Sequence, residues 1–396
     1  MNQTLFDPYN REQQIEPYPL YRYLREHEPL QRNEERGFWV LSRHADVLAV
    51  FLDPATYSSA KGSFPDDDPA RVGNTLGTTD PPRHNRLRKL ASSAFTPRRI
   101  ASMEPVIRTL AQDLLQPARD GVPLEVPSEF AVPLTSAVIS TILGVPMSDV
   151  PMMQSWSHQS FRLDSTGQDG TVEQQEALRN LLDYLAESAA LRRRDPDKYD
   201  DLLADVVRAE VDGDRLTDSE VSWLAQTLFI AGHETTSSSI GNGIAVLAAN
   251  PDARLKLART PGLIPDAFEE MLRLDSPAQG FRRTLTQSAV LYGRRLEPGE
   301  SLVILPGSAN RDERVFADPD HFDIERRPRQ HLAFGQGVHY CIGAPLSRLE
   351  NRVVFEVLLD AFPEWSVNWG QSERSFAGRF MLRGYARLPT LFRGAR

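Results

Sequence analysis

Apolar residues recur with a helical period in the last quarter of this chain. Starting at Leu346, the apolar positions Leu349, Val353, Val357 and Ala361 follow at spacings of three to four residues. Residues spaced in this way lie on one face of a helix. The pattern therefore predicts an amphipathic helix that packs this face against the core.

A second long helix is predicted between residues 217 and 250. It opens with Thr217-Asp-Ser-Glu220, which has the form of a capping box, and Pro251 follows its last position. Elsewhere residues 80–250 are mostly helical in pattern, whereas 37–42 and 290–306 resemble strands with turn signals at Gly293 and Pro298-Gly299. In residues 309–329 the apolar positions follow neither a helical nor a strand period, which predicts an irregular segment. This order of helical and strand-like segments predicts a mainly α chain (α+β) with small β-sheets.

Composition narrows the class of protein. The chain is 40% hydrophobic and 25% charged, as ordinary soluble globular proteins are. No linker, repeat or low-complexity tract divides it, so residues 1–396 are expected to form a single domain. The net charge of −9 argues against nucleic acid as a partner.

The chain shows no sign of export or membrane insertion. Its single cysteine allows no internal disulfide, which fits a reducing cytoplasm. The first residues have neither the basic nor the apolar region of a signal peptide. Residues 130–147 lack charges but contain two prolines, so a buried helix is expected there rather than a membrane span. We expect a cytoplasmic protein with no membrane contact.

The single cysteine, Cys341, lies in a glycine-rich segment, Phe334-Gly-Gln-Gly-Val-His-Tyr-Cys341-Ile-Gly343. A lone cysteine is most often a small buried apolar residue. Here, however, the glycines allow the backbone to approach a flat partner closely. The position just before a helix N-terminus favours a thiolate, which suits axial ligation of haem iron. A zinc site would need more ligands nearby, and a Cys–His hydrolase would need a general base that has no signature here.

The motif Phe334-Gly335-x-Gly337-x-His339-x-Cys341-x-Gly343 resembles the haem-binding loop of the cytochrome P450 family, the haem-thiolate monooxygenases. The resemblance covers essentially the whole chain and implies the family's triangular helical fold. It also implies haem b with Cys341 as the iron ligand. Phe334 and Gly335 would contact the cofactor, and His339 would bind a propionate.

Two other segments resemble propionate-binding parts of that family. His84 and Arg88 share one face of a helix that opens with Pro81-Pro82. In isolation they would indicate only an exposed basic helix, but the resemblance assigns both to the propionates. Arg283 resembles a further propionate arginine, with the adjacent Arg282 as the alternative.

The segment Ala231-Gly-His-Glu-Thr-Thr236 lies in the middle of the second predicted helix. Glycine and paired threonines weaken a helix. They indicate either a site that opens to admit a ligand or close packing of helices at small residues. The segment resembles the family's oxygen-activating helix, which implies that Glu234 and Thr235 are the catalytic acid–alcohol pair that delivers protons to dioxygen.

Glu270 and Arg273 place opposite charges on one helical face, a weak signal by itself. In the family that this chain resembles, such a pair is buried. It has a structural role there and is joined by a further arginine. Arg326 is our candidate for that arginine, with Arg327 as the alternative.

The resemblance also places a substrate pocket. By family position we expect Leu76, Phe229, Ile230, Ala231 and Phe281 to line it, together with residues near Phe161 and in 74–75, 278–280 and 376–382. These positions are mainly apolar, so the substrate is expected to be an apolar small organic molecule.

The expected activity is that of a monomeric monooxygenase, which uses O2 and receives electrons from a separate ferredoxin and ferredoxin reductase. Residues 83–99 carry six Arg or Lys and no acidic residue. They form either a solvated surface or a docking face for an acidic redox protein. Other possibilities are an isomerase or dehydratase without a redox partner, a peroxide-driven enzyme, and a haem-based sensor. The intact Glu234–Thr235 pair argues against these alternatives.

Overall fold

The computed structural model describes residues 5–65, 67–161, 172–376 and 381–394. Across these residues the chain is mainly helical with small sheets, as predicted. The helices are α1 (Arg11–Ile15), α2 (Tyr18–His27), α3 (His44–Leu52), α4 (Arg83–Ala94), α5 (Pro97–Ala101), α6 (Glu104–Leu114), α7 (Gln116–Arg119), α8 (Val132–Leu143), α9 (Val150–Phe161), α10 (Val172–Arg194), α11 (Leu202–Arg208), α12 (Asp218–Ala249), α13 (Pro251–Arg259), α14 (Ile264–Leu274), α15 (Pro306–Ala309) and α16 (Ala344–Ala361).

The strands form small sheets of two to five members. The largest has the order β1-β2-β10-β7-β3, in which β2 and β10 are parallel and the other neighbours are antiparallel. The strands are β1 (Leu30–Asn33), β2 (Phe38–Leu41), β3 (Tyr57–Ser58), β4 (Leu124–Glu125), β5 (Glu210–Val211), β6 (Asp214–Arg215), β7 (Phe281–Leu285), β8 (Ala289–Leu291), β9 (Arg294–Leu296), β10 (Ser301–Ile304), β11 (Glu364–Val367), β12 (Glu373–Arg374), β13 (Tyr385–Arg387) and β14 (Pro389–Arg393).

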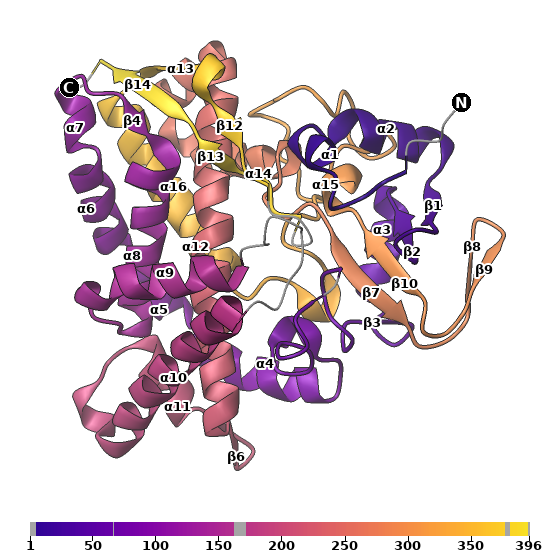
Figure 1. The fold of residues 1–396 in the computed structure, drawn as a ribbon. Helices are drawn as coiled ribbons and strands as arrows, with labels where there is room; N and C mark the ends of the chain where they lie inside the picture. The colour runs from indigo at the N-terminus through magenta and orange to yellow at the C-terminus, as the bar shows by residue number, and fades with distance from the viewer. Residues whose placement is uncertain (1–4, 66, 162–171, 377–380, 395–396) are drawn as a thin grey trace.

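The molecule has a helical side and a sheet side (Figure 1). On the helical side, α12 packs against α8, α10 and α16 around buried residues such as Phe130 and Phe355. On the sheet side, the five-stranded sheet packs its apolar face against α3, with Leu41, Phe51 and Ile304 in the core. The cavity described below lies where the two sides meet.

Small residues let the long helix α12 approach its neighbours closely. A Cβ atom on Gly232 would lie 2.9 Å from Ile139 Cδ1 of α8, and one on Gly243 would lie 2.4 Å from Phe355 Cζ of α16. The helix continues unbroken through Gly232, and the predicted capping box of Thr217 and Glu220 is present at its start. Gly232 therefore allows close packing and also lies on the lining of the cavity described below.

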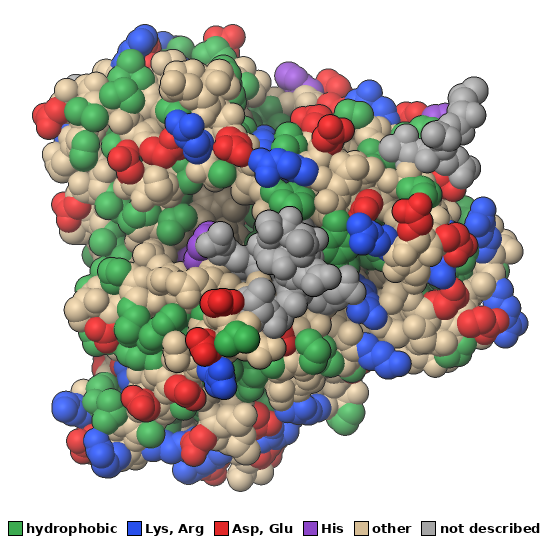
Figure 2. Space-filling model, in the orientation of Figure 1, with side chains coloured by type: hydrophobic (Ala, Val, Ile, Leu, Met, Phe, Trp, Pro, Cys, Tyr) green, Lys and Arg blue, Asp and Glu red, His purple; other side chains and the backbone are tan. Residues whose placement is uncertain are grey.

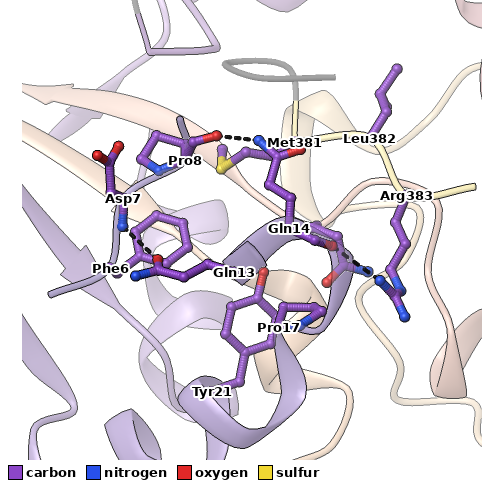
Figure 3. A pocket seen from close by; sticks show the side chains of 11 residues that line it. Phe6, Asp7, Pro8, Gln13, Gln14, Pro17, Tyr21, Met381, Leu382 and Arg383 are labelled. Atoms are coloured by element: carbon purple, nitrogen blue, oxygen red, sulfur yellow. Dashed lines mark hydrogen bonds between the residues drawn. The ribbon is translucent and has the colours of Figure 1, made fainter. Parts of the chain in front are cut away.

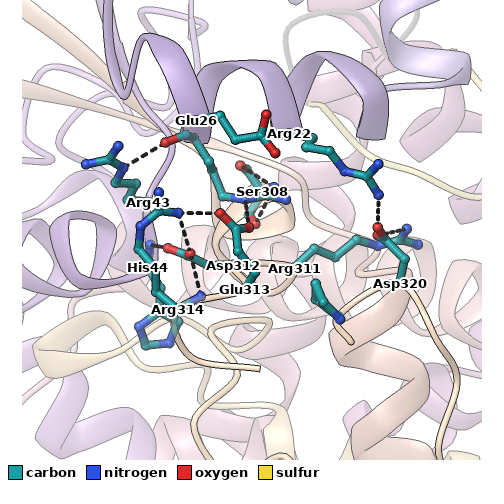
Figure 4. Close-up of polar contacts among 12 residues, drawn as sticks. Arg22, Glu26, Arg43, His44, Ser308, Arg311, Asp312, Glu313, Arg314 and Asp320 are labelled. Carbon is teal, nitrogen blue, oxygen red and sulfur yellow. Dashed lines mark hydrogen bonds and ion pairs between the residues drawn. The ribbon is translucent and has the colours of Figure 1, made fainter. Parts of the chain in front are cut away.

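The N-terminal helices are fixed to the rest of the chain by buried polar contacts. Arg25 of α2 is buried, donates to Ser308 O at 3.1 Å and pairs with Glu313 at 3.3 Å, while Asp312 accepts from His44 N at 2.9 Å (Figure 4). Near a small pocket lined by residues from Phe6 to Tyr21, Arg383 donates to the carbonyls of residues 14 and 15 (Figure 3). These contacts join the first and last parts of the chain.

One stretch of the described residues, Val126–Leu143, is apolar and long enough to cross a membrane. It comprises a short π-helical turn followed by α8. Two-thirds of it (67%) is buried inside the protein, where it packs against α12. It is thus a core helix here, as its prolines predicted.

Candidate active site

A cavity of about 330 Å³ lies between α12, α4, β7 and the segment that carries Cys341. Most of the predicted cofactor and catalytic residues line it. They are His84, Arg88, Thr235, Arg283, Phe334, Gly335, His339 and Cys341. Residues that lie far apart in the sequence are therefore brought to one site.

Backbone geometry at two glycines shapes the loop that carries Cys341. Gly335 and Gly337 have φ angles of 69° and 68°, in the left-handed region that favours glycine. A Cβ atom on Gly337 would lie 2.6 Å from Phe51 O, so the loop fits against the end of α3 only with glycine there. The Cys341 N–H donates to Phe334 O at 2.9 Å, which closes the loop just before α16.

The helix terminus does not by itself ionise Cys341. Burial raises the pKa of the thiol above its ordinary value, although backbone N–H groups of Gly343 and Ala344 and the charge of Arg88 oppose this effect. The sequence led us to expect that the helix N-terminus would favour the thiolate, and desolvation outweighs it. A thiol in such a place loses its proton when it binds a metal cation.

The edge of the cavity holds buried histidine ring nitrogens that have no hydrogen-bond partner in the described part of the chain. The Nε2 atoms of His84 and His339 are buried and have no hydrogen-bond partner among the described residues. Their rings lie 4.4 Å apart, edge to face. Burial and the positive charges of Arg283, His84 and Arg88 lower the pKa of His339 to about 3, so its ring is neutral. Buried polar atoms without a partner are rare in folded proteins, so this edge indicates a ligand with polar groups.

Arg283 adds a positive charge to the same edge. It is only 4% exposed, and burial lowers its pKa to about 10. Its Nη1 donates to Arg282 O at 2.7 Å, whereas the side chain of Arg282 donates to Ser301 Oγ instead. Of the two arginines considered, Arg283 is the one that lines the cavity. Together with Arg88 it makes this edge suitable for a ligand with carboxylate groups.

Glu234 and Thr235 lie side by side on α12 but face different surroundings. Thr235 lines the cavity, and its hydroxyl donates to Ala231 O at 2.7 Å. Glu234 turns to His233, with 3.2 Å between Glu234 Oε1 and His233 Nε2. Burial raises the pKa of Glu234, but the hydrogen bond and charge of His233 outweigh it and leave the pKa below its ordinary value. Only the alcohol of the predicted pair faces the cavity in this structure.

The apolar part of the cavity differs in part from the prediction. Leu76, Ala231 and Phe281 line it, but Phe229 and Ile230 do not. Positions spaced by three and four along a helix share a face, so Leu228 and Ala231 lie on the face of Thr235. Phe229 and Ile230 point into the helical core instead, and the Phe229 ring packs against His233. Leu228 could have been found by counting back seven residues from Thr235.

Of the other positions predicted to line the pocket, some line the cavity, some do not, and some lie outside the described residues. Ala278 and Leu382 line the cavity, and Asn74 does not. The region beside Phe161 and residues 377–380 lie outside the described residues. Ile139 of α8 and Phe64 also line the cavity and were missed, because neither lies in a motif.

Glu350 of α16 is a further residue that the sequence did not single out. It lies four positions after Leu346 and three before Val353, so the phase of the helix places it on the face of these apolar residues. In the structure it lines the cavity while being only 2% exposed, and its Oε2 has no hydrogen-bond partner among the described residues. Burial raises its pKa well above the ordinary value, so it is a neutral acid.

The Glu270 cluster, made of Glu270, Arg273 and Arg326, is outside the cavity. Glu270 and Arg273 are fully buried, with two hydrogen bonds of 2.7 and 2.8 Å between them. Arg326 Nε lies 3.0 Å from Glu270 Oε1, whereas Arg327 pairs with Asp266. Arg326 is thus the arginine that joins the cluster.

The basic residues of segment 83–99 do not form a uniformly positive face. Arg86 pairs with Asp214 and Glu220, and Lys89 pairs with Asp212. Arg99 likewise pairs with two aspartates, residues 200 and 205. On the face shown in Figure 2, residues of both charges are interspersed. The neutralising acids come from segments more than a hundred positions away, around α11, in the β5–β6 hairpin and at the start of α12, so the sequence alone left both interpretations of this segment open.

Comparison with known proteins agrees with this geometry. A sequence profile of the family described as Cytochrome P450 matches residues 32–259 and 263–384. The chain is 36% identical over 381 residues to vitamin D(3) 25-hydroxylase of Pseudonocardia autotrophica, covering 94% of this chain and 93% of that protein. It is 36% identical over 352 residues to cyclomarin C epoxidase CymV of Salinispora arenicola, covering 87% and 89%.

A solved structure, cytochrome P450 CYP109Q5 from Chondromyces apiculatus, superposes with a TM-score of 0.87. The two chains are 34% identical, and 97% of each is covered. The profile, the relatives and the fold agree over nearly the whole length, and the cysteine loop lies at the cavity. The chain therefore belongs to the cytochrome P450 family.

Proposed function

We propose that this protein is a haem-thiolate monooxygenase, which inserts one oxygen atom from O2 into an apolar organic substrate with electrons from a separate ferredoxin and its reductase. Family membership implies a haem cofactor. The single observation that carries the proposal is the cavity, which joins a partly buried cysteine, Thr235 and an edge with two arginines and with histidine Nε2 atoms that have no partner in the described ranges.

The residues of the cavity fit haem b. His84 and His339 carry buried Nε2 atoms without acceptors, and Arg88 and Arg283 carry the positive charge that two propionates would neutralise. Cys341 would be the iron ligand, where a thiolate favours cleavage of the O–O bond of bound dioxygen. Left-handed glycines keep the loop backbone close to α3, so the sulfur is held at a fixed depth beside the cavity.

On the other helix, Thr235 would place a hydroxyl in the cavity and Glu234 would supply protons to it. Such a relay directs protons to the reacting oxygen and away from wasteful routes. Thr235 already has its hydroxyl on the cavity face. Glu234 would have to turn away from His233 to serve it.

The lining supports an apolar substrate. Leu76, Ile139, Leu228, Ala231, Phe281 and Leu382 surround the part of the cavity away from the charged edge. A pocket with this lining gains affinity mainly by removing apolar surface from water. The relative that is named a vitamin D(3) hydroxylase acts on a compound of this general kind.

The carbon monoxide spectrum of the reduced protein tests the cysteine assignment. We expect the parent protein to show the strongly red-shifted Soret band that a thiolate ligand produces. Cys341→Ser should bind haem without that band. A parent protein with an unshifted band would overturn the assignment.

Turnover with a ferredoxin and its reductase tests the reaction class. The parent should form an oxygenated product and consume NAD(P)H, whereas an isomerase or a sensor would do neither. Thr235→Ala should still bind haem and substrate but yield less product and more hydrogen peroxide per NAD(P)H. If its yield equals that of the parent, the proposed relay is wrong.

A further inference from the structure

His233 is a buried histidine that the site described above does not yet use. Its side chain is only 3% exposed, next to Glu234, which is 35% exposed. The Nδ1 atom lies 2.8 Å from Phe229 O in the preceding turn of α12. On the other side of the ring, Nε2 lies 3.2 Å from Glu234 Oε1 and 3.4 Å from Ser157 Oγ of α9.

Hydrogen-bond chemistry sets the number of protons in this pair. A carbonyl oxygen only accepts, so Nδ1 must carry a hydrogen toward Phe229 O. The Nε2 atom of a neutral ring is then an acceptor, and an ionised carboxylate is also an acceptor. A contact of 3.2 Å between two acceptors needs a hydrogen between them. One shared proton, held either as imidazolium and carboxylate or as imidazole and carboxylic acid, makes this contact attractive.

The elements packed around the pair bring one further ionisable residue, His158, within reach of Glu234. From α9, Ser157 contributes a hydroxyl, and His158 is the other ionisable residue that acts on Glu234 among those described. From α8, Thr135 donates to the backbone carbonyl of His233 at 3.2 Å. No described arginine, lysine or second carboxylate pairs with Glu234. The pair can therefore exchange its proton internally.

We propose that His233 is the positioning residue of the acid–alcohol pair: it shares one proton with Glu234 and holds the carboxyl in a resting position next to the cavity, from which Glu234 turns to reach Thr235. The proton moves from His233 Nε2 to Glu234 Oε1, which leaves a neutral ring and a carboxylic acid. When that acid passes its proton toward Thr235, water restores the proton at the exposed part of the carboxyl. The use of this proton rests on the proposed function, whereas the position of the carboxyl does not.

Two substitutions of His233 separate its two roles, which are to hold the Glu234 carboxyl in place and to share a proton with it. In His233→Asn the amide nitrogen replaces Nδ1, so the bond to Phe229 O is kept and the contact with Glu234 is lost. In His233→Gln the amide nitrogen lies near the position of Nε2, so it can hold the carboxyl but cannot carry the shared proton. His27→Asn on the surface of α2 is the matched control, because His27 lies outside the cavity.

Crystal structures of the haem-loaded proteins test the position. We expect Glu234 to contact residue 233 in the parent and in His233→Gln, and to leave it in His233→Asn. Unchanged placement of Glu234 in His233→Asn would overturn the positioning role. This readout needs no turnover, so it stands even if the protein proves to have no monooxygenase activity.

Product yield per NAD(P)H between pH 6 and pH 9 tests the shared proton. The yield of the parent and of His27→Asn should fall as the pH rises, because the pair then loses its proton to water. His233→Gln should give about ten-fold less product per NAD(P)H at pH 7, a smaller loss than removal of the proton donor itself would cause, and show little pH dependence. If His233→Gln restores the parental yield and pH profile, the ring acts only as a structural support and the shared-proton proposal is wrong.

Discussion

Two groups of buried charged and polar side chains in this protein differ in how completely they are paired. In the Glu270 cluster, Arg273 donates to both carboxylate oxygens and to the carbonyls of residues 310, 319 and 321. At the cavity edge, His84, His339 and Arg283 bury donors that the described residues do not fully satisfy. The first group completes the fold, and the second requires a ligand.

Substitution in the paired group should affect folding most. Glu270→Ala leaves Arg273 as an uncompensated buried charge, which costs about 3–5 kcal/mol of unfolding free energy. Urea unfolding of the apoprotein measures this cost. Glu373→Ala, which removes an exposed ion pair with Arg11, is the matched control and should cost below about 1 kcal/mol. If Glu270→Ala and Glu373→Ala lower the unfolding free energy equally, the Glu270 cluster does not stabilise the fold in the way proposed.

Substitution at the cavity edge should affect cofactor binding instead. Arg283→Met removes a buried charge that lacks a carboxylate partner, so the apoprotein should unfold at an equal or higher temperature. Loss of hydrogen bonds to a charged ligand should weaken haem binding by about 1.5–3 kcal/mol, or roughly ten- to a hundred-fold. Haem transfer to apomyoglobin and thermal scans of the apoprotein measure the two effects. A destabilised apoprotein would mean that Arg283 supports the fold.

Glu269 lies next to Glu270 on α14 but nearer the cysteine loop. It tests whether a carboxylate close to the cavity can also be fully paired and stabilise the fold. Its carboxylate binds Arg348 at 2.6 Å and His331 at 2.8 Å. Burial raises the pKa of Glu269, but these partners outweigh it and hold the pKa at about 2. A lowered carboxyl pKa stabilises the fold above the ordinary pKa and less as the pH falls toward 2.

The stability of the parent should therefore decrease between pH 6 and pH 3.5, with about 1 kcal/mol due to Glu269. Urea unfolding at both pH values measures the decrease, and Glu269→Gln should lack this share of it. Glu34→Gln, at a side chain that is 81% exposed, serves as the control. If the unfolding free energy of Glu269→Gln depends on pH as strongly as that of the parent, the decrease is due to other carboxyl groups.

The smallest effect is expected on the surface. Lys89 and Asp212 form an ion pair in which both side chains are mostly exposed. Lys89→Glu should change the unfolding free energy by less than about 1 kcal/mol. Because this charge is already neutralised, the rate of haem reduction by a ferredoxin at low salt should change less than two-fold. A much larger, salt-dependent decrease would restore the docking interpretation of segment 83–99.

Local patterns in the sequence were sufficient for the helices and the cysteine loop. The capping box at Thr217 and the period from Leu346 each lie within one element, and α12 and α16 formed where they predicted. Partners from distant segments could not be read in this way. The acids that neutralise Arg86 and the burial of Glu350 depend on how the elements pack. Phe229 and Ile230 failed for a simpler reason, since family position was used there without the phase of the helix.

The pairing of β2 with β10 has a consequence for how the protein is made. Trp39 lies opposite Leu302 in this sheet, and Gly337 fits against Phe51, so early and late parts of the chain complete each other. During synthesis β2 leaves the ribosome long before β10 exists, so β2 can pair with β1 while its other edge stays without a partner. Exposed strand edges of this kind are prone to aggregation. Nascent chains should therefore be prone to aggregation until β10 and the cysteine loop have been made.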